Sequence, residues 1–113
     1  GQWARAKGFD TFCPLGPWIT THLRIEEASQ LGIRATVTRD GATIERQDST
    51  TANLVHGIAE LVEFVTAFTT LLPGDVILTG TPEGVGRLLP GDVVHVEVEG
   101  LGTLSNPVVA AEA

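Results

Sequence analysis

Apolar residues recur at helical spacing in only one long stretch of the chain, and this limits the fold to a mostly β architecture. Their three- and four-residue steps would place them on one face of a helix. The set comprises Leu54, Val55, Ile58, Leu61, Val62, Val65 and Phe68. Candidate N-caps in residues 48–51 precede this stripe, and Pro73 follows it. The sequence therefore predicts one main helix, at about residues 53–70.

Strand patterns lie on both sides of this helix. Residues 33–39 alternate apolar and polar, and Asp40-Gly41 suits a tight turn into a returning strand at 42–47. Residues 76–79 form a continuous apolar run, typical of a buried strand, and 93–99 with 103–109 predict a second hairpin. We therefore expect an α+β fold, mostly β, in which the helix packs against a sheet or roll.

Charge and composition exclude several classes of function. The net charge of −7 argues against a broad nucleic-acid footprint, which needs clustered basic residues. No apolar run approaches the roughly 20 residues that span a bilayer, so we expect no membrane partner. The single cysteine, Cys13, suits a reducing compartment and predicts a cytoplasmic protein. The 113 residues fit one domain, and a first residue that is glycine leads us to expect further residues upstream.

Lys7 is the only lysine in the chain. It lies between apolar and aromatic residues, ahead of a proline-rich loop at residues 8–19. A lysine near apolar surface and another cation has its charged form disfavoured and can act as a base or an electrophile. The alternative is a surface lysine whose stem covers apolar neighbours.

Residues 78–86 bring three glycines, two threonines and a proline together after the apolar run. Glycine lets backbone amides and hydroxyl groups come close to an anion, because it has no Cβ. The spacing matches neither a dinucleotide fingerprint nor a P-loop. An ordinary glycine turn is the alternative interpretation.

Other candidate groups are weaker. Cys13 could be a nucleophile, although a lone cysteine among apolar neighbours is more often a small buried hydrophobe. The three histidines lack metal-ligand spacing, and for His95 and His56 we favour solvation or a local hydrogen bond. Glu97 and Glu99 would share one strand face, which we expect to be solvated rather than metal-binding.

Two long blocks, residues 7–19 and 73–86, resemble the fumarylacetoacetate hydrolase family. The hairpin with Gln47-Asp48-Ser49-Thr50 and the helix between the blocks also resemble that family in order and spacing. The resemblance runs over nearly the whole chain. It implies a β-roll or sandwich with mixed sheets, of which residues 1–113 would be the carboxyl-terminal part of a single catalytic domain.

The resemblance also implies an activity. Members of the family act on 2-oxo or 1,3-dioxo carboxylates, in the breakdown of aromatic compounds among other pathways. The reactions include acylpyruvate or fumarylpyruvate hydrolysis, isomerisation of 2-hydroxyhepta-2,4-diene-1,7-dioate and decarboxylation of oxaloacetate. They share an enolate stabilised by a divalent cation, here expected to be Mg²⁺ with Mn²⁺ or Ca²⁺ as alternatives. The intact protein would be a homodimer.

Several residues take implied roles from the resemblance. Lys7 would stabilise the developing anion, and Thr81 would hydrogen-bond a substrate carboxylate or oxo group, with Gly80 leaving room for it. Thr11 would lie close to the site, and Asp10 would orient Lys7. The family's metal carboxylates, and its water-activating histidine and glutamate, correspond to positions upstream of Gly1. The intact protein is thus expected to be an enzyme, whereas the chain alone could be an inactive fragment or a binding module.

Overall fold

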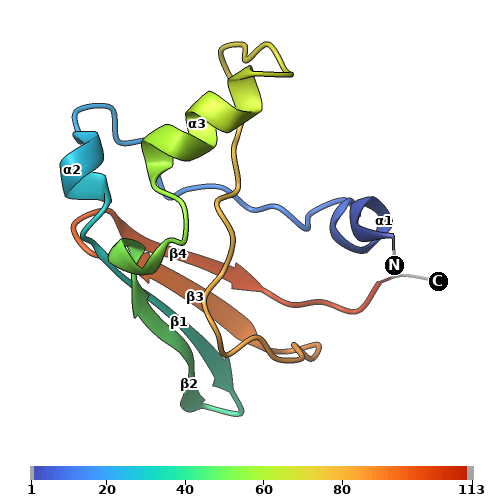
Figure 1. The fold of residues 1–113 in the computed structure, drawn as a ribbon. Coiled ribbons are helices and arrows are strands. Elements are labelled where there is room, and N and C mark those ends of the chain that lie inside the picture. Colours follow the sequence, from blue (N-terminus) through green and yellow to red (C-terminus); the bar gives the residue numbers. More distant parts are fainter. Residues whose placement is uncertain (1, 112–113) are drawn as a thin grey trace.

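The computed structural model describes residues 2–111, and its centre is a four-stranded antiparallel sheet (Figure 1). The strands are β1 (Gly32–Arg39), β2 (Ala42–Thr50), β3 (Val93–Val98) and β4 (Gly102–Pro107). Their order across the sheet is β2-β1-β3-β4, so β2 and β4 are the edges. Both predicted hairpins are therefore present, and the mostly β fold class is confirmed.

The β1–β2 hairpin has two features that follow from its backbone. Asp40 and Gly41 at its tip have φ angles of +50° and +78°, the left-handed values that the Asp-Gly pair predicts for a tight turn. Further along, Ala35 faces Gln47 whereas Thr36 faces Glu45. Arg46 is therefore the extra residue of a β-bulge on the edge strand, where such bulges are common and redirect nearby side chains.

The helices differ from the prediction. The main helix, α3, spans Ile58–Thr66 rather than residues 53–70, and a separate 3₁₀ turn, η1, occupies Thr51–Asn53. Two short helices were not expected: α1 (Trp3–Lys7) and α2 (Ile25–Ala28). In Figure 1, α3 lies above the sheet, and α1 stands apart from the sheet at the right of the view.

Local hydrogen bonds explain where the helical segments begin and end. The Thr50 hydroxyl accepts from the Ala52 N–H at 3.2 Å, which favours a tight 3₁₀ turn after β2. Gly57 then starts α3 with its N–H donated to the Glu60 carboxylate at 2.8 Å. At the other end, the Thr66 hydroxyl donates to the Val62 carbonyl at 2.8 Å. Leu54 and Val55 lie between η1 and α3, and Phe68 lies beyond α3, so the helix is shorter than the apolar stripe.

The apolar run at residues 76–79 is not a strand, so the prediction of a buried strand there is wrong. Val76 and Leu78 are 54% and 70% exposed, and the segment descends as irregular chain from the region of α3 towards β3 (Figure 1). A strand needs a neighbour for its backbone groups. Within residues 2–111 no strand pairs with this segment.

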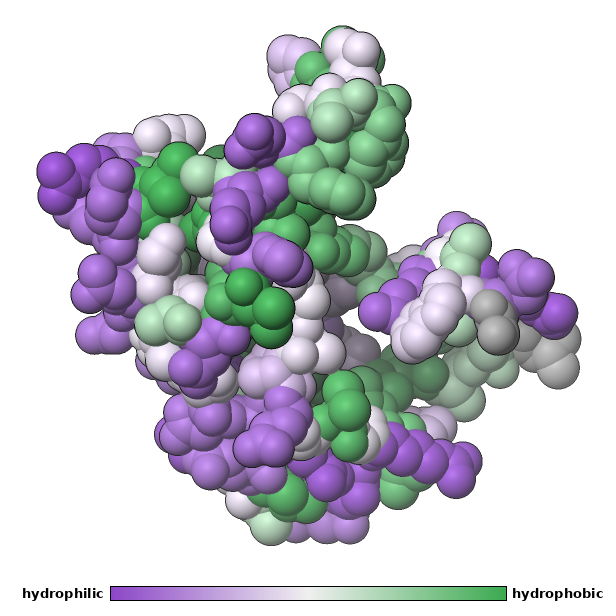
Figure 2. Space-filling view, viewed as in Figure 1, coloured by the Kyte–Doolittle hydropathy of each residue, from purple (hydrophilic) through white to green (hydrophobic). Residues whose placement is uncertain are grey.

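The apolar core of the described residues is thin. Val37 in β1 is the only apolar side chain among residues 2–111 that is fully buried, at 1% exposure. Large apolar side chains remain exposed, including Phe64 and Phe68 of the α3 region, and Figure 2 shows hydrophobic residues gathered over this end of the molecule. None of the described helices has the length and apolar character that crossing a bilayer requires.

Candidate functional site

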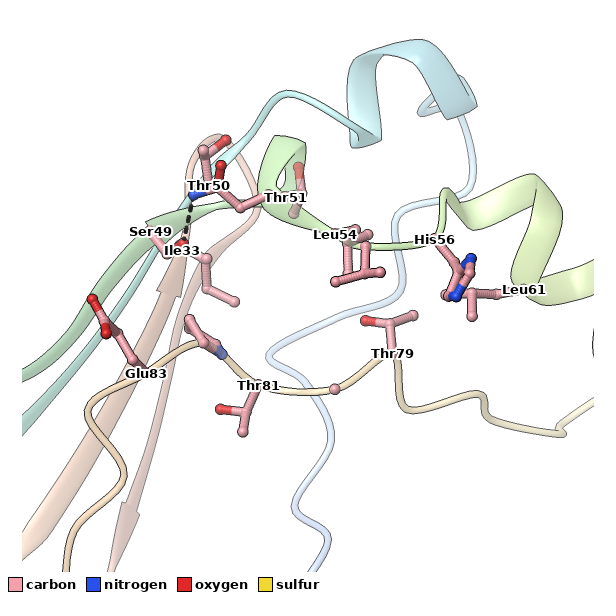
Figure 3. A pocket seen from close by; sticks show the side chains of 14 residues that line it. Ile33, Ser49, Thr50, Thr51, Leu54, His56, Leu61, Thr79, Thr81 and Glu83 are labelled. Atoms are coloured by element: carbon pink, nitrogen blue, oxygen red, sulfur yellow. Dashed lines mark hydrogen bonds between the residues drawn. The ribbon is translucent and has the colours of Figure 1, made fainter.

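A cavity of about 540 Å³ lies between the ends of β1 and β2, the start of α3 and residues 79–83 (Figure 3). Its lining is rich in hydroxyl groups, which are carried by Ser49, Thr50, Thr51, Thr79 and Thr81. His56 and Glu83 are the titratable residues of this lining, and Ile33, Leu54 and Leu61 give it an apolar wall. The cavity therefore combines apolar surface with uncharged hydrogen-bonding groups, a mixture common in small-molecule sites.

Residues 79–84 are called the glycine segment below. Its two threonines project to opposite sides of it. Thr79 points towards Leu54, whereas Thr81 points away from it (Figure 3). Gly80 lies between them with a φ angle of +103°, and a Cβ added there would meet no atom within 4 Å. The glycine thus turns the chain in a conformation that L-residues rarely adopt, and it leaves open space beside the threonines.

The glycine segment is fixed to the bulged part of β2. The Gln47 carboxamide nitrogen donates to the Thr81 hydroxyl at 2.9 Å and to the Pro82 carbonyl at 2.6 Å. Gly84, at φ +100°, passes so close to β2 that an added Cβ would overlap the Arg46 carbonyl oxygen. Two consecutive residues of one edge strand therefore hold the segment at two points.

Lys7, Asp10 and Thr11 lie outside the lining of this cavity. Lys7 is exposed in the last turn of α1, where its ammonium lies 5.2 Å from the centroid of the Trp3 ring. Thr11 is in the turn that follows, with the left-handed φ of +68°. The structure thus brings Gly80 and Thr81 to the cavity but not the residues of the α1 region, whose roles stay predictions.

The weaker candidates have clear environments. Cys13 is exposed, so its interpretation as a buried hydrophobe is wrong. His95 forms the expected local hydrogen bonds, to the Ser105 hydroxyl at 2.8 Å and the Thr38 hydroxyl at 3.1 Å. Glu97 and Glu99 are both exposed, as predicted, but Glu99 follows the end of β3 and its carboxylate accepts from the Gly32 N–H at 3.1 Å.

Two further polar contacts lie at α2 and at the start of α3. Glu27 accepts from the Arg24 backbone N–H at 3.0 Å and caps α2, so this carboxylate has a structural role. His56 precedes α3 rather than lying on it, and its Nδ1 is 3.8 Å from the Glu60 carboxylate.

A divalent cation does not fit residues 2–111 by themselves. Metal sites in proteins are built from several oxygen or nitrogen ligands held close together. Among residues 2–111 no three histidine, cysteine, aspartate or glutamate side chains form such a group. The lining of the cavity offers one carboxylate, Glu83.

Gln47 and Arg46 were not singled out from the sequence as site residues. Residues 44–48 contain one apolar side chain, Ile44, followed by four polar or charged ones, so the pattern cannot reveal where the ladder slips by one position. Only the pairing with β1 shows the bulge. The family resemblance includes Gln47 but gives it no role, and the direction of its side chain becomes clear only from the structure.

Comparison with known proteins decides the family. The family model for the C-terminal part of fumarylacetoacetate (FAA) hydrolase matches residues 1–109. The chain belongs to this family. It spans about two fifths of the length of the first curated relatives that it matches, at 49–51% identity.

Three similar proteins show the range of activities in the family. The oxaloacetate tautomerase fahd2 of Xenopus laevis is 46% identical over 96% of this chain and 35% of its own length. A crystal structure of 5-carboxymethyl-2-hydroxymuconate delta-isomerase from Mycobacterium smegmatis gives a TM-score of 0.88 at 56% identity, covering 99% of this chain and 42% of that one. Maleylpyruvate hydrolase from Sphingobium sp. SYK-6, in complex with manganese(II) and pyruvate, gives 0.80 at 40% identity, covering 89% and 37%. The fold of this family member is thus similar to that of one protein named as an isomerase and one named as a hydrolase.

Proposed function

We propose that the full-length protein is an enzyme that acts on small 2-oxo or 1,3-dioxo carboxylates. The observation that carries this proposal is the glycine segment at residues 79–84, which β2 fixes with its Thr81 hydroxyl exposed. It stands in a chain similar to enzymes named for oxaloacetate, a hydroxymuconate and maleylpyruvate. The three compounds in these names share a carboxylate next to an oxo or enol group.

The proposed reaction is hydrolysis of an acylpyruvate or fumarylpyruvate, or isomerisation of a substrate such as 2-hydroxyhepta-2,4-diene-1,7-dioate. Decarboxylation of oxaloacetate is the alternative. Each passes through an enolate, whose negative charge needs a donor or a cation close by. We assign Thr81 to hydrogen-bond the substrate carboxylate or oxo oxygen, and Lys7 to stabilise the enolate. Asp10 and Thr11 would support Lys7, and Gly80 gives the substrate access.

The proposal includes a divalent cation, with Mg²⁺ as the expected ion. The maleylpyruvate hydrolase with bound manganese(II) supports a divalent ion in this family. Because residues 2–111 hold no suitable group of ligands, its carboxylates would come from outside them. A homodimer in the cytoplasm completes the proposal, the location resting on the single cysteine.

Turnover by the full-length protein tests this function. Hydrolysis of acylpyruvate or fumarylpyruvate would be followed by loss of enol absorbance and by the acids released. Isomerisation of 2-hydroxyhepta-2,4-diene-1,7-dioate would be followed by loss of enol absorbance alone, and decarboxylation of oxaloacetate by the pyruvate formed. We expect consumption of at least one substrate with MgCl₂ present, and its loss when EDTA is added. If none is consumed with Mg²⁺, Mn²⁺ or Ca²⁺, the proposal is wrong.

A second candidate concerns residues 1–113 in isolation, as an inactive fragment or binding module. The thin core and the missing metal ligands favour it. We expect this isolated chain to show no metal-dependent turnover and to aggregate readily, because exposed apolar surface promotes association. Metal-dependent activity from the isolated chain would contradict this.

A further inference from the structure

The contacts of Gln47 fix which way its carboxamide group faces. Its terminal nitrogen lies 2.6 Å from the Pro82 carbonyl oxygen, and a carbonyl oxygen can only accept a hydrogen bond. The group facing Pro82 must therefore be the NH₂ and not the oxygen. This NH₂ has two hydrogens, of which one goes to Pro82 and the other to the Thr81 hydroxyl oxygen at 2.9 Å.

The role of the Thr81 hydroxyl follows from this orientation. Its oxygen accepts from Gln47, so its own single hydrogen is left to donate elsewhere. Among the hydrogen bonds within residues 2–111, none has Thr81 Oγ1 as the donor. The side chain is exposed and points away from Leu54 (Figure 3). Thr81 thus presents a hydrogen-bond donor to whatever binds beside it.

The backbone explains why Gln47 reaches this loop. A bulge at Arg46 interrupts the alternation of side chains along β2 immediately before Gln47. Because β2 is an edge strand, the segment at residues 81–84 can pass beside it. Gly84 then lies against the Arg46 carbonyl, where a side chain would not fit.

We propose that Gln47 is a positioning residue that acts through Thr81. By giving both carboxamide hydrogens to residues 81 and 82, it makes the Thr81 hydroxyl a donor and selects a ligand group that accepts, such as a carboxylate or keto oxygen. This inference rests on the proposed function and specifies the polarity that the substrate must present at Thr81.

Gln47→Glu in the full-length protein tests the polarity. An ionised carboxylate at this position can only accept, so it would take the Thr81 hydrogen and repel the Pro82 carbonyl and the substrate carboxylate. We expect KM to rise about ten-fold or more, the size expected when a hydrogen bond to a charged group is lost. Gln30→Glu, which adds the same charge at an exposed position, is the control and should leave KM unchanged.

The pH dependence of this variant separates positioning from simple structural damage. A protonated glutamic acid regains one O–H donor, and the ordinary pKa of glutamate is about 4.3. The ratio of KM between Gln47→Glu and the unmodified protein should therefore fall as the pH is lowered from 7 towards 5. A ratio that does not change with pH would contradict the proposal.

A double-mutant cycle provides the second test. Gln47→Leu and Thr81→Val each remove one partner, and together they should raise KM little more than Thr81→Val alone, because Gln47 acts through Thr81. Effects on KM that simply add would overturn the proposal.

Pyruvate binding, measured by NMR titration, keeps this proposal separate from the proposed function. The protein could turn over no oxo acid and yet bind pyruvate, with non-additive effects of the Gln47 and Thr81 substitutions on affinity. That result would contradict the proposed activity and support the role of Gln47. If pyruvate does not bind at all, or binds equally well to Thr81→Val, the role of Gln47 falls as well.

Discussion

The Arg39 guanidinium and the Asp92 carboxylate form two hydrogen bonds of 2.7 Å, Nε to Oδ1 and Nη2 to Oδ2. They join the end of β1 to the turn that precedes β3. Asp92 is 1% exposed, and its carboxylate also accepts from the Leu89 N–H at 2.8 Å. Its backbone carbonyl accepts from the Val108 N–H at 2.8 Å. One buried aspartate therefore connects β1, the turn at residues 89–92 and the end of β4.

Because of this ion pair, the stability of the folded protein depends on pH in the acid range. The Arg39 guanidinium, with the Leu89 N–H, lowers the pKa of Asp92 from its ordinary value of 3.8 to about 2. The charged form of Asp92 is thus favoured in the folded state. It contributes to the stability of the folded protein above about pH 4, and this contribution is lost as the pH falls towards 2. We expect Asp92→Asn to lower the Tm by about 5 °C or more at pH 7, and the difference from the unmodified protein to shrink at pH 2–3.

A surface ion pair that joins β1 to β2 is the control. Arg34 and Glu45 are hydrogen-bonded through Nε at 2.9 Å, but both side chains are 51% exposed. Exposed ion pairs contribute little because water and salt screen them. Glu45→Gln should therefore leave the Tm nearly unchanged at pH 7, and an equal loss in the two variants would contradict the importance given to Asp92.

Gly84→Ala should detach the glycine segment from β2. The new Cβ would overlap the Arg46 carbonyl, and the φ of +100° is unfavourable for alanine. We expect unfolding free energy to fall by about 3 kcal/mol or more, the sum of strain and overpacking. Gly91→Ala is the matched control: its φ is +94° and no atom lies within 4 Å of the added Cβ, so only about 1–2 kcal/mol of backbone strain is expected. Denaturant unfolding of both variants measures the difference.

Gly102→Ala should move the Trp18 ring. An added Cβ would lie 2.8 Å from Trp18 Cη2, at the point where the loop of residues 8–19 contacts the β3–β4 turn. Because Trp18 is 62% exposed, the ring can shift outward and its fluorescence should change with only a modest loss of stability. Gly100→Ala in the same turn, with no neighbour within 4 Å, should leave the emission unchanged. A Trp3→Phe background removes the other tryptophan of residues 1–113.

Much of the sheet could be predicted because its signals are local. The alternation at residues 33–39 and 93–98 and the positive φ that Asp40-Gly41 tolerates are properties of a few neighbouring residues. The family resemblance was likewise carried by two continuous blocks and is confirmed by the match over residues 1–109.

Features that depend on distant partners were missed. The run at residues 76–79 looks like a strand, but no described strand pairs with it. The helix boundaries depend on side-chain caps such as Thr50 and Glu60, which apolar spacing does not reveal. Of the candidate site, Thr81 and Gly80 were found, whereas Gln47 required the bulge in the β1–β2 register.

The assignment of Lys7 can be tested by its effect on the chemical step. In the structure its ammonium rests near the Trp3 ring, a contact that contributes only about 0.5–1 kcal/mol when exposed. Such a contact would not explain a large change in rate. If Lys7 stabilises a developing enolate, Lys7→Met should lower kcat by about 10²-fold or more, since loss of anion stabilisation commonly costs that much. Arg5→Met, in the same exposed helix, is the control and should leave kcat unchanged. A small, equal effect of both substitutions would assign Lys7 to the solvated surface of α1.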